Sequence, residues 1–311
     1  LPAALGYLVL RNVLAGLSRP GAVTATAWMS VVVLFAVGRV LVPGGEDAST
    51  IVRRAALAVS AVQWVSAVVL AWVVIRVRRA AGRAFGGSRE DEPAAGTGSG
   101  RELLRVGAPI ALMFLAESGF FTAIGLLIGH LGHIALAGHQ IAVQVSYLTF
   151  MLPSGIGMAT TVRVGLALAT GDKGRSRQAG MTGVALAATA MLASTLVLLV
   201  ARHEIAALFV DPRSPDAEAA VRAGAGLLIV AAGFQMFDGV QGVAAAALRG
   251  MKETGRSLVL GLVSYWGVGF VVGVGLHRNG FGVYGYWLGL AAGLACAAML
   301  LTWAFVRATS S

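Results

Sequence analysis

The sequence contains too few charged residues to coat a water-soluble protein. Only 12% of its 311 residues are Asp, Glu, Lys or Arg, whereas a soluble globular domain usually has about 25%. Its hydrophobic share is 57% and its mean hydropathy is +0.80. This composition excludes an ordinary soluble fold and indicates a protein that crosses a membrane.

The sequence is also poor in cysteine and in the motifs of common enzymes. Cys296 is the single cysteine, so no disulfide can form within the chain, and it lies in an apolar run where it suits packing. There is no HExxH motif, no GxSxG motif and no glycine-rich phosphate loop followed by Lys and Ser or Thr. The spacing of His130, His133 and His139 is too loose for a metal site. We therefore expect no enzyme, no cofactor and no metal centre.

Long apolar runs are what the sequence has in place of charge. Residues 106–129 contain one charge, Glu117, and residues 258–276 contain none. A membrane span needs roughly 20 apolar residues, and isolated strands cannot satisfy their backbone groups in lipid. The sequence therefore predicts an all-α, polytopic membrane bundle. Nine spans are expected, at 2–17, 22–42, 55–76, 104–129, 135–162, 179–201, 222–247, 257–276 and 283–306.

The distribution of basic residues predicts how these spans are oriented. Of the 24 Lys and Arg residues, 17 fall on one side of the predicted membrane and 7 on the other. The positive-inside rule makes the first side cytoplasmic. The net charge of +10 then indicates contact with anionic lipid headgroups of the surrounding membrane, and it does not indicate nucleic-acid binding.

One polar stretch divides the chain. Residues 79–102 are rich in Gly, Ala and Ser, carry both charge signs and contain Pro93, a composition typical of a flexible cytoplasmic linker. It separates three spans in residues 1–78 from a six-helix lobe in residues 103–311. Because the sequence starts at Leu1 within a span-like run, we expect an N-terminally truncated chain with more sequence upstream.

Two acids lie within predicted spans. Glu117 sits midway along 104–129 and Asp238 within 222–247. A carboxylate in a span costs several kcal/mol and usually marks function, although each acid could also be a buried group neutralised by protonation or by hydrogen bonds. Two acids in one lobe favour function, because a close pair of buried carboxyl groups suits the uptake of H⁺ or Na⁺. The sequence leaves open whether the two side chains meet.

Several neighbouring residues could assist these acids. Gln235 and Gln241 lie three residues before and after Asp238, near its face of the helix. Phe234 could offer its ring to a cation or simply pack among apolar residues. Pro153, Gly155 and Gly157 predict a kink in the span 135–162, where a helix could bend as a hinge.

A family resemblance begins at residue 105. The run RVGAPIALMFLAESGFFTAIGLLIGHLGHIALAGHQIAVQVSYLTFMLPSGIGMATTVRVG, followed by LFVDP, FQMFDGVQGVAAAALRGMKETGRS, SYWGVG and YWLGLAAGL, resembles the multidrug and toxic compound extrusion (MATE) transporters of the bacterial NorM type. The likeness covers about 105–306 and is weaker before Val77. It implies a twelve-helix transporter of two six-helix lobes, of which this chain would hold the fourth to the twelfth helix. The missing part would include an acidic residue of the first helix.

The resemblance also implies roles for residues. Glu117 and Asp238 match the acids of the family's seventh and tenth helices, which bind the coupling cation. Phe234 falls where some members have Tyr, and Gln140 matches a position in the central cavity. We expect the substrate cavity to be lined by Gln140, Phe234, Gln235 and Gln241.

The function implied is drug export by alternating access. The chain would belong to a monomeric antiporter of the inner (plasma) membrane that exchanges H⁺ or Na⁺ for amphipathic, mostly cationic small molecules. One alternative is a flippase or exporter of lipid-linked oligosaccharides from the same superfamily, although such proteins tend to line their cavity with cations. Another alternative is a truncated membrane module that does not transport.

Overall fold

The computed structural model describes residues 29–30, 32–33, 36, 48–84 and 100–310. The described residues form helices and contain no strand, so the expected all-α class is confirmed. The expected span 2–17, most of the span 22–42 and residues 85–99 of the expected linker lie outside the described residues. The chain divides into two compact units, Leu1–Thr97 and Gly98–Ser311.

The first unit contains one long described helix, α3 (Ala48–Ala84). Its apolar stretch Ala56–Arg76 is long enough to cross a membrane. Ser66 is buried, and its Oγ lies 2.7 Å from Oγ of Ser30 and donates to the carbonyl of Val62. These bonds satisfy a hydroxyl group that would otherwise be costly in an apolar environment.

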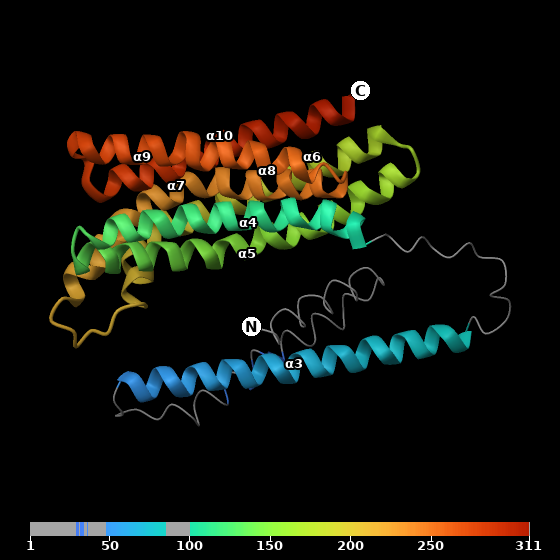
Figure 1. The fold of residues 1–311 in the computed structure, drawn as a ribbon. Coiled ribbons are helices and arrows are strands. Elements are labelled where there is room, and N and C mark those ends of the chain that lie inside the picture. Colours follow the sequence, from blue (N-terminus) through green and yellow to red (C-terminus); the bar gives the residue numbers. More distant parts are fainter. Residues whose placement is uncertain (1–28, 31, 34–35, 37–47, 85–99, 311) are drawn as a thin grey trace. The chain divides into compact units, whose positions relative to one another are not determined.

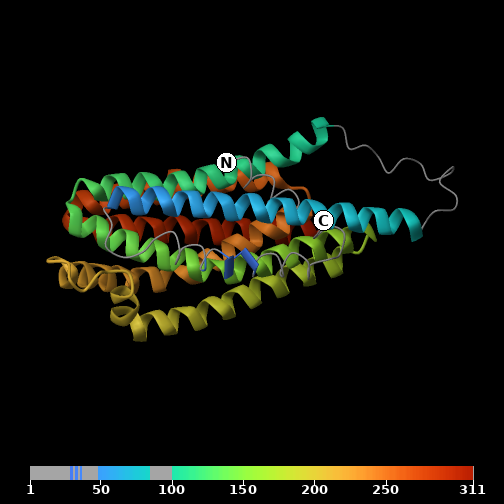
Figure 2. The same ribbon diagram turned by 90° about the horizontal axis from the view of Figure 1, so that it is seen from below.

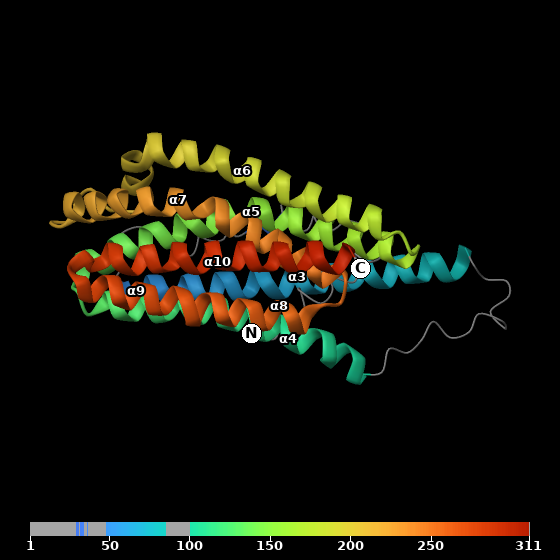
Figure 3. The same ribbon diagram turned by 90° about the horizontal axis from the view of Figure 1, so that it is seen from above.

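The second unit is a bundle of long helices that run side by side (Figures 1, 2 and 3). Its elements are α4 (Gly100–Gly129), α5 (His133–Ala169), α6 (Lys173–Ala207), α7 (Ala217–Gly250), α8 (Thr254–Leu262), the π-helical segment η1 (Val263–Phe270), α9 (Val271–Leu276), the short segment η2 (His277–Phe281) and α10 (Gly282–Ser310). Each of the seven expected spans beyond residue 48 falls on these helices or on α3.

The last apolar stretch reverses direction within η2. Thr254–Ser310 is continuous by hydropathy, but Gly280 and Gly282 have φ angles of 90° and 57°, which side chains rarely adopt. Beyond this reversal α10 returns against α9 and η1, as Figure 3 shows. The two segments approach so closely that a Cβ at Gly289 would collide with the backbone of Gly273. Small residues permit such close packing of helices in a membrane.

Helix α7 forms the centre of the second unit and packs against α5, α6 and α10. Its buried face is rich in small and apolar residues from Ala220 to Leu248. At the crossing with α5, Gly157 packs on Ala246, and Thr161 donates from Oγ1 to the carbonyl of Ala246 at 2.8 Å. This central position places every polar side chain of α7's buried face inside the bundle.

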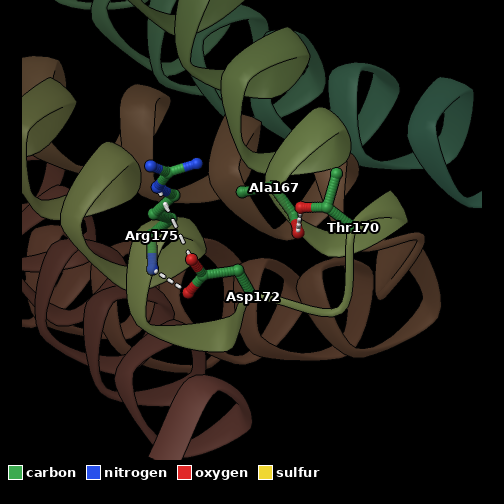
Figure 4. A network of polar contacts seen from close by, with 4 residues as sticks. All are labelled: Ala167, Thr170, Asp172 and Arg175. Carbon is green, nitrogen blue, oxygen red and sulfur yellow. Dashed lines mark hydrogen bonds and ion pairs between the residues drawn. The ribbon is translucent and has the colours of Figure 1, made fainter.

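The turn between α5 and α6 is held by local polar contacts (Figure 4). Asp172 is the N-cap of α6 and accepts a hydrogen bond from the backbone N–H of Arg175 at 2.8 Å. Its second carboxylate oxygen lies 3.5 Å from Nε of Arg175, and Thr170 donates to the carbonyl of Ala167. Such a cap satisfies an otherwise unpaired N–H of the first helical turn.

Candidate functional site

Helices α4 and α7 bring the two intramembrane acids into one polar network. The amide nitrogen Nε2 of Gln241 donates to Oε1 of Glu117 at 3.0 Å and to Oδ1 of Asp238 at 3.2 Å. Asp238 is 7% exposed and Gln241 1% exposed, while Glu117 is half-buried. The carboxyl groups therefore share a single nitrogen atom, although they lie on helices far apart in sequence.

A buried tyrosine completes this network. The hydroxyl of Tyr265, in η1, donates to Oε1 of Gln241 at 2.9 Å. The Tyr265 side chain is fully buried and stacks on Phe120, three residues after Glu117, with ring centroids 5.9 Å apart. A glutamine amide offers two N–H donors and one carbonyl acceptor. Each of these groups of Gln241 has a partner here.

Residue spacing on α7 and packing between distant helices together bring these side chains to one place. Asp238 and Gln241 are three residues apart on α7, so they share one face of the helix. Helix α4 packs along α8 and η1, and Nε1 of Trp266 donates to the carbonyl of Ala116 at 3.1 Å, next to Glu117. Adjacent residues of η1 thus bond to both acid-bearing helices.

The charges of the two acids have little compensation. Among the described residues neither carboxyl group forms an ion pair, and the ion pairs that do form are exposed ones such as Arg222 with Glu218. Arg249 lies with its guanidinium 5.8 Å from the centre of the Phe114 ring, one turn before Glu117. Two buried carboxylates with a neutral donor between them are costly, and a bound H⁺ or Na⁺ would relieve that cost.

The described residues hold no group of three or more His, Cys, Asp or Glu side chains that could bind a metal ion. The oxygens gathered at the site are those of two carboxyl groups, one amide and one hydroxyl. Oxygen ligands of this kind suit hard cations. What the arrangement can do chemically is therefore to hold a proton or a small hard cation.

The other residues expected in the substrate cavity are placed differently from one another. Phe234 is fully buried and stacks on Trp287, with ring centroids 5.5 Å apart. Gln235 is 1% exposed, and within the described residues neither of its amide atoms has a hydrogen-bond partner. Gln140 lies exposed on α5. Of the four expected residues, the structure brings Gln241 to the acids, and cavity lining stays a prediction for all four.

The expected hinge lies within a continuous helix. α5 runs through Pro153 to Ala169, and Pro153 and Gly157 are buried while Gly155 is exposed. A proline inside a helix removes one backbone hydrogen bond and weakens the helix at that point. Bending at Pro153 stays a prediction.

Sequence reasoning missed Tyr265 and Trp266. Both lie in the stretch SYWGVG, which the sequence offers as part of an apolar span without acids or amides nearby. Their partners, Gln241 and Ala116, are 24 and 150 residues away in the chain. A polar aromatic pair in the middle of a span was the available signal, because buried Tyr and Trp usually find a hydrogen-bond partner.

Comparison with known proteins gives the family. The MatE family profile matches residues 109–274, more than half of the chain. The chain is 43% identical to the multidrug resistance protein NorM of Burkholderia vietnamiensis, over 68% of this chain and 46% of that protein. It is 36% identical to a probable multidrug resistance protein NorM of Deinococcus radiodurans, over 98% of this chain and 66% of that protein. The chain thus spans about half the length of most curated relatives it matches.

Solved structures agree on the fold. The chain superposes on the crystal structure of MATE in complex with MaL6 with a TM-score of 0.82 at 19% identity, covering 98% of this chain and 66% of that one. The eukaryotic MATE transporter AtDTX14 gives a TM-score of 0.80 at 19% identity, with the same coverage. With long apolar helices, an acid pair between two of them and a NorM relative over almost its whole length, this chain is a multi-pass membrane protein that belongs to the MatE family.

Proposed function

We propose that the complete protein containing this chain exports amphipathic, mostly cationic organic compounds in exchange for H⁺ or Na⁺. The observation that carries this proposal is the buried network in which Glu117 and Asp238 share the amide of Gln241. A pair of acids with so little charge compensation within a membrane bundle is suited to binding and releasing a cation. The curated relatives are named as multidrug resistance proteins, which supports organic compounds as the cargo.

The coupling follows from differential affinity. In alternating access, the two lobes of a transporter expose a central site to one side of the membrane and then to the other. A cation that binds more tightly to one of these states shifts the population toward it. Binding of H⁺ or Na⁺ at Glu117 and Asp238 would select the state that releases the organic compound outside. The protein acts in the inner membrane, as a monomer and as a transporter without enzymatic chemistry.

The sign of the charge favours cationic cargo. Within the described residues, the network of the buried Asp238 and the half-buried Glu117 contains no basic group. Among those residues, the nearby basic side chains, the buried His139 and the half-buried Arg249, form no ion pair with either acid. A flippase for lipid-linked oligosaccharides must accommodate a negatively charged pyrophosphate, for which cations are the natural partners. Acids at mid-membrane would instead repel that group and attract organic cations.

Ethidium efflux from cells tests the proposal. Cells without their own exporters would express the complete gene product, either unchanged or as Glu117→Gln, Asp238→Asn or Glu218→Gln, at equal membrane amounts. We expect efflux to fall about tenfold or more in the first two variants, a loss of at least about 1.4 kcal/mol in coupling. Glu218→Gln is the matched control, because Glu218 is exposed and pairs with Arg222 away from the site.

Two outcomes would overturn the proposal. Efflux at the unchanged rate in both site variants would move the coupling site to other residues. An unchanged protein that exports neither ethidium nor any other cationic dye would exclude cation export. A lipid-linked oligosaccharide or a non-transporting module would then be the next candidate.

A further inference from the structure

The amide nitrogen of Gln241 occupies the position that a cation shared by the two acids would take. It lies 3.0 Å from Oε1 of Glu117 and 3.2 Å from Oδ1 of Asp238, so each carboxyl group receives one of its two N–H groups. The hydrogens of this NH₂ group place partial positive charge beside both acids, but the amide carries no net charge. A cation bound between the same two oxygens would have to displace it.

The opposite side of the amide is held by Tyr265. Oε1 of Gln241 accepts the Tyr265 hydroxyl at 2.9 Å, and both side chains are buried. A half-turn of the amide group would exchange its oxygen and nitrogen. Its oxygen would then face the acids, where it can ligate Na⁺ or accept a hydrogen bond from a protonated carboxyl group. Its nitrogen would face the Tyr265 hydroxyl, which can accept as well as donate.

We propose that Gln241 is a two-position switch that reports whether the acid pair is loaded. When the acids are empty, the amide donates to them and accepts from Tyr265, as in this structure. When H⁺ or Na⁺ is bound, the amide turns its oxygen toward the acids and donates to the Tyr265 oxygen. In both positions the oxygen and the nitrogen of the Gln241 amide each have a partner. The turned position costs the Tyr265 O–H its acceptor, and cation binding at the acids has to offset that loss. This inference rests on the proposed function, because it needs the acids to be the cation site.

Tyr265 is the residue that carries the change outward. The next residue, Trp266, donates from Nε1 to the carbonyl of Ala116 at 3.1 Å, on the helix that bears Glu117. Both lie in η1, a π-helical segment, and such segments occur frequently at functional sites. Reversal of the Tyr265 hydrogen bond therefore acts on a segment that is bonded to both acid-bearing helices. Tyr265 is a positioning residue, since it acts on the acids through Gln241.

Infrared difference spectroscopy of the complete protein in lipid tests this switch. Spectra would be recorded without the cation and after Na⁺ addition or an acid step, with and without ¹³C-labelled glutamine. We expect a carboxyl band, the C=O stretch of the protonated acid after the acid step or a shifted carboxylate stretch after Na⁺ addition, that is lost in Glu117→Gln/Asp238→Asn. We also expect a side-chain amide C=O band that shifts with the label and is lost in Gln241→Met. A difference spectrum with the carboxyl band but no glutamine band, or with a glutamine band that persists in Gln241→Met, would overturn the switch alone.

If neither Na⁺ addition nor the acid step produced the carboxyl band in the unchanged protein, the proposed function would be overturned, and the switch with it. Tyr265→Phe provides a second test that does not depend on how well Gln241→Met folds. We expect this variant to shift the cation-free amide band and to lower the maximal efflux rate, with the cation concentration for half-maximal efflux changed less than twofold. Ser264→Ala is its matched control, because the buried Ser264 hydroxyl donates to the carbonyl of Leu260, four residues earlier, and not to Gln241. An amide band that is equal in Tyr265→Phe and the unchanged protein would contradict the role of Tyr265.

Discussion

The bond between Tyr265 and Gln241 makes a quantitative prediction about stability. Tyr265→Phe leaves Oε1 of Gln241 buried without its donor, which costs about 1–3 kcal/mol. Gln241→Met leaves the Tyr265 hydroxyl and two carboxyl groups without their partner. Because a carboxyl group can respond by taking up a proton, we expect about 2–4 kcal/mol rather than three full penalties.

The double variant should cost less than the sum of the two single variants. Once Gln241 is gone, Tyr265→Phe removes a hydroxyl that no longer has its partner, and replacing both members of a buried bond is close to neutral. Interhelical hydrogen bonds in membrane proteins couple by about 0.6 kcal/mol on average and by about 1.7 kcal/mol at most. Because both side chains here are at most 1% exposed, we expect about 1–2 kcal/mol.

Unfolding in mixed micelles, followed by far-UV circular dichroism, would measure the free energies of unfolding of four proteins. These are the unchanged complete protein, Tyr265→Phe, Gln241→Met and the double variant. A second cycle pairs Gln241→Met with Thr195→Val, because the Thr195 hydroxyl donates to Ala232 at 2.8 Å and does not bond to Gln241. That cycle should be additive within about 0.5 kcal/mol. If the free energies in the cycle of Gln241→Met and Tyr265→Phe also added within about 0.5 kcal/mol, the bond and the network built on it would be refuted.

Two further predictions concern the scaffold. Gly289→Val should destabilise the protein by about 1–3 kcal/mol, because a side chain there collides with the backbone of Gly273. Gly275→Val is the control, since Gly275 has open space around it. Equal unfolding midpoints for the two variants would contradict the close crossing. Asp172→Ala should cost about 0.5–2 kcal/mol through loss of the cap of α6, measured by the same unfolding assay. Asp172→Asn should recover most of that loss, and an Ala variant as stable as the parent would contradict the cap.

The sequence predicted the fold class and singled out the two acids that the structure joins through Gln241, because both depend on local composition. A span is recognised from its own residues, and an acid inside a span is conspicuous against apolar neighbours. Gln241 was also found locally, since its spacing of three from Asp238 places both on one helix face. What the sequence could not predict is which way each helix is rotated toward the others.

Tyr265 and Gln140 both illustrate this limit. Tyr265 looked like an apolar-span residue, yet rotation of η1 turns its hydroxyl to Gln241. Gln140 is expected in the cavity by family resemblance; it lies exposed on α5, and cavity lining stays a prediction for it. Such outcomes depend on contacts between elements far apart in the chain, and no local pattern records them.

The chemical identity of residue 241 bears on how a site of this kind can cycle. A lysine there would form a buried ion pair with the acids, and breaking such a pair costs about 3–5 kcal/mol, which an incoming Na⁺ or H⁺ would have to overcome. An apolar residue would leave two carboxyl groups without any donor, so the empty site would rarely form. A neutral amide supplies hydrogen bonds that satisfy the empty acids but leaves their charge largely uncompensated. In the proposed cycle the acids would therefore retain affinity for a cation, and release of that cation would return them to a state with hydrogen-bond partners.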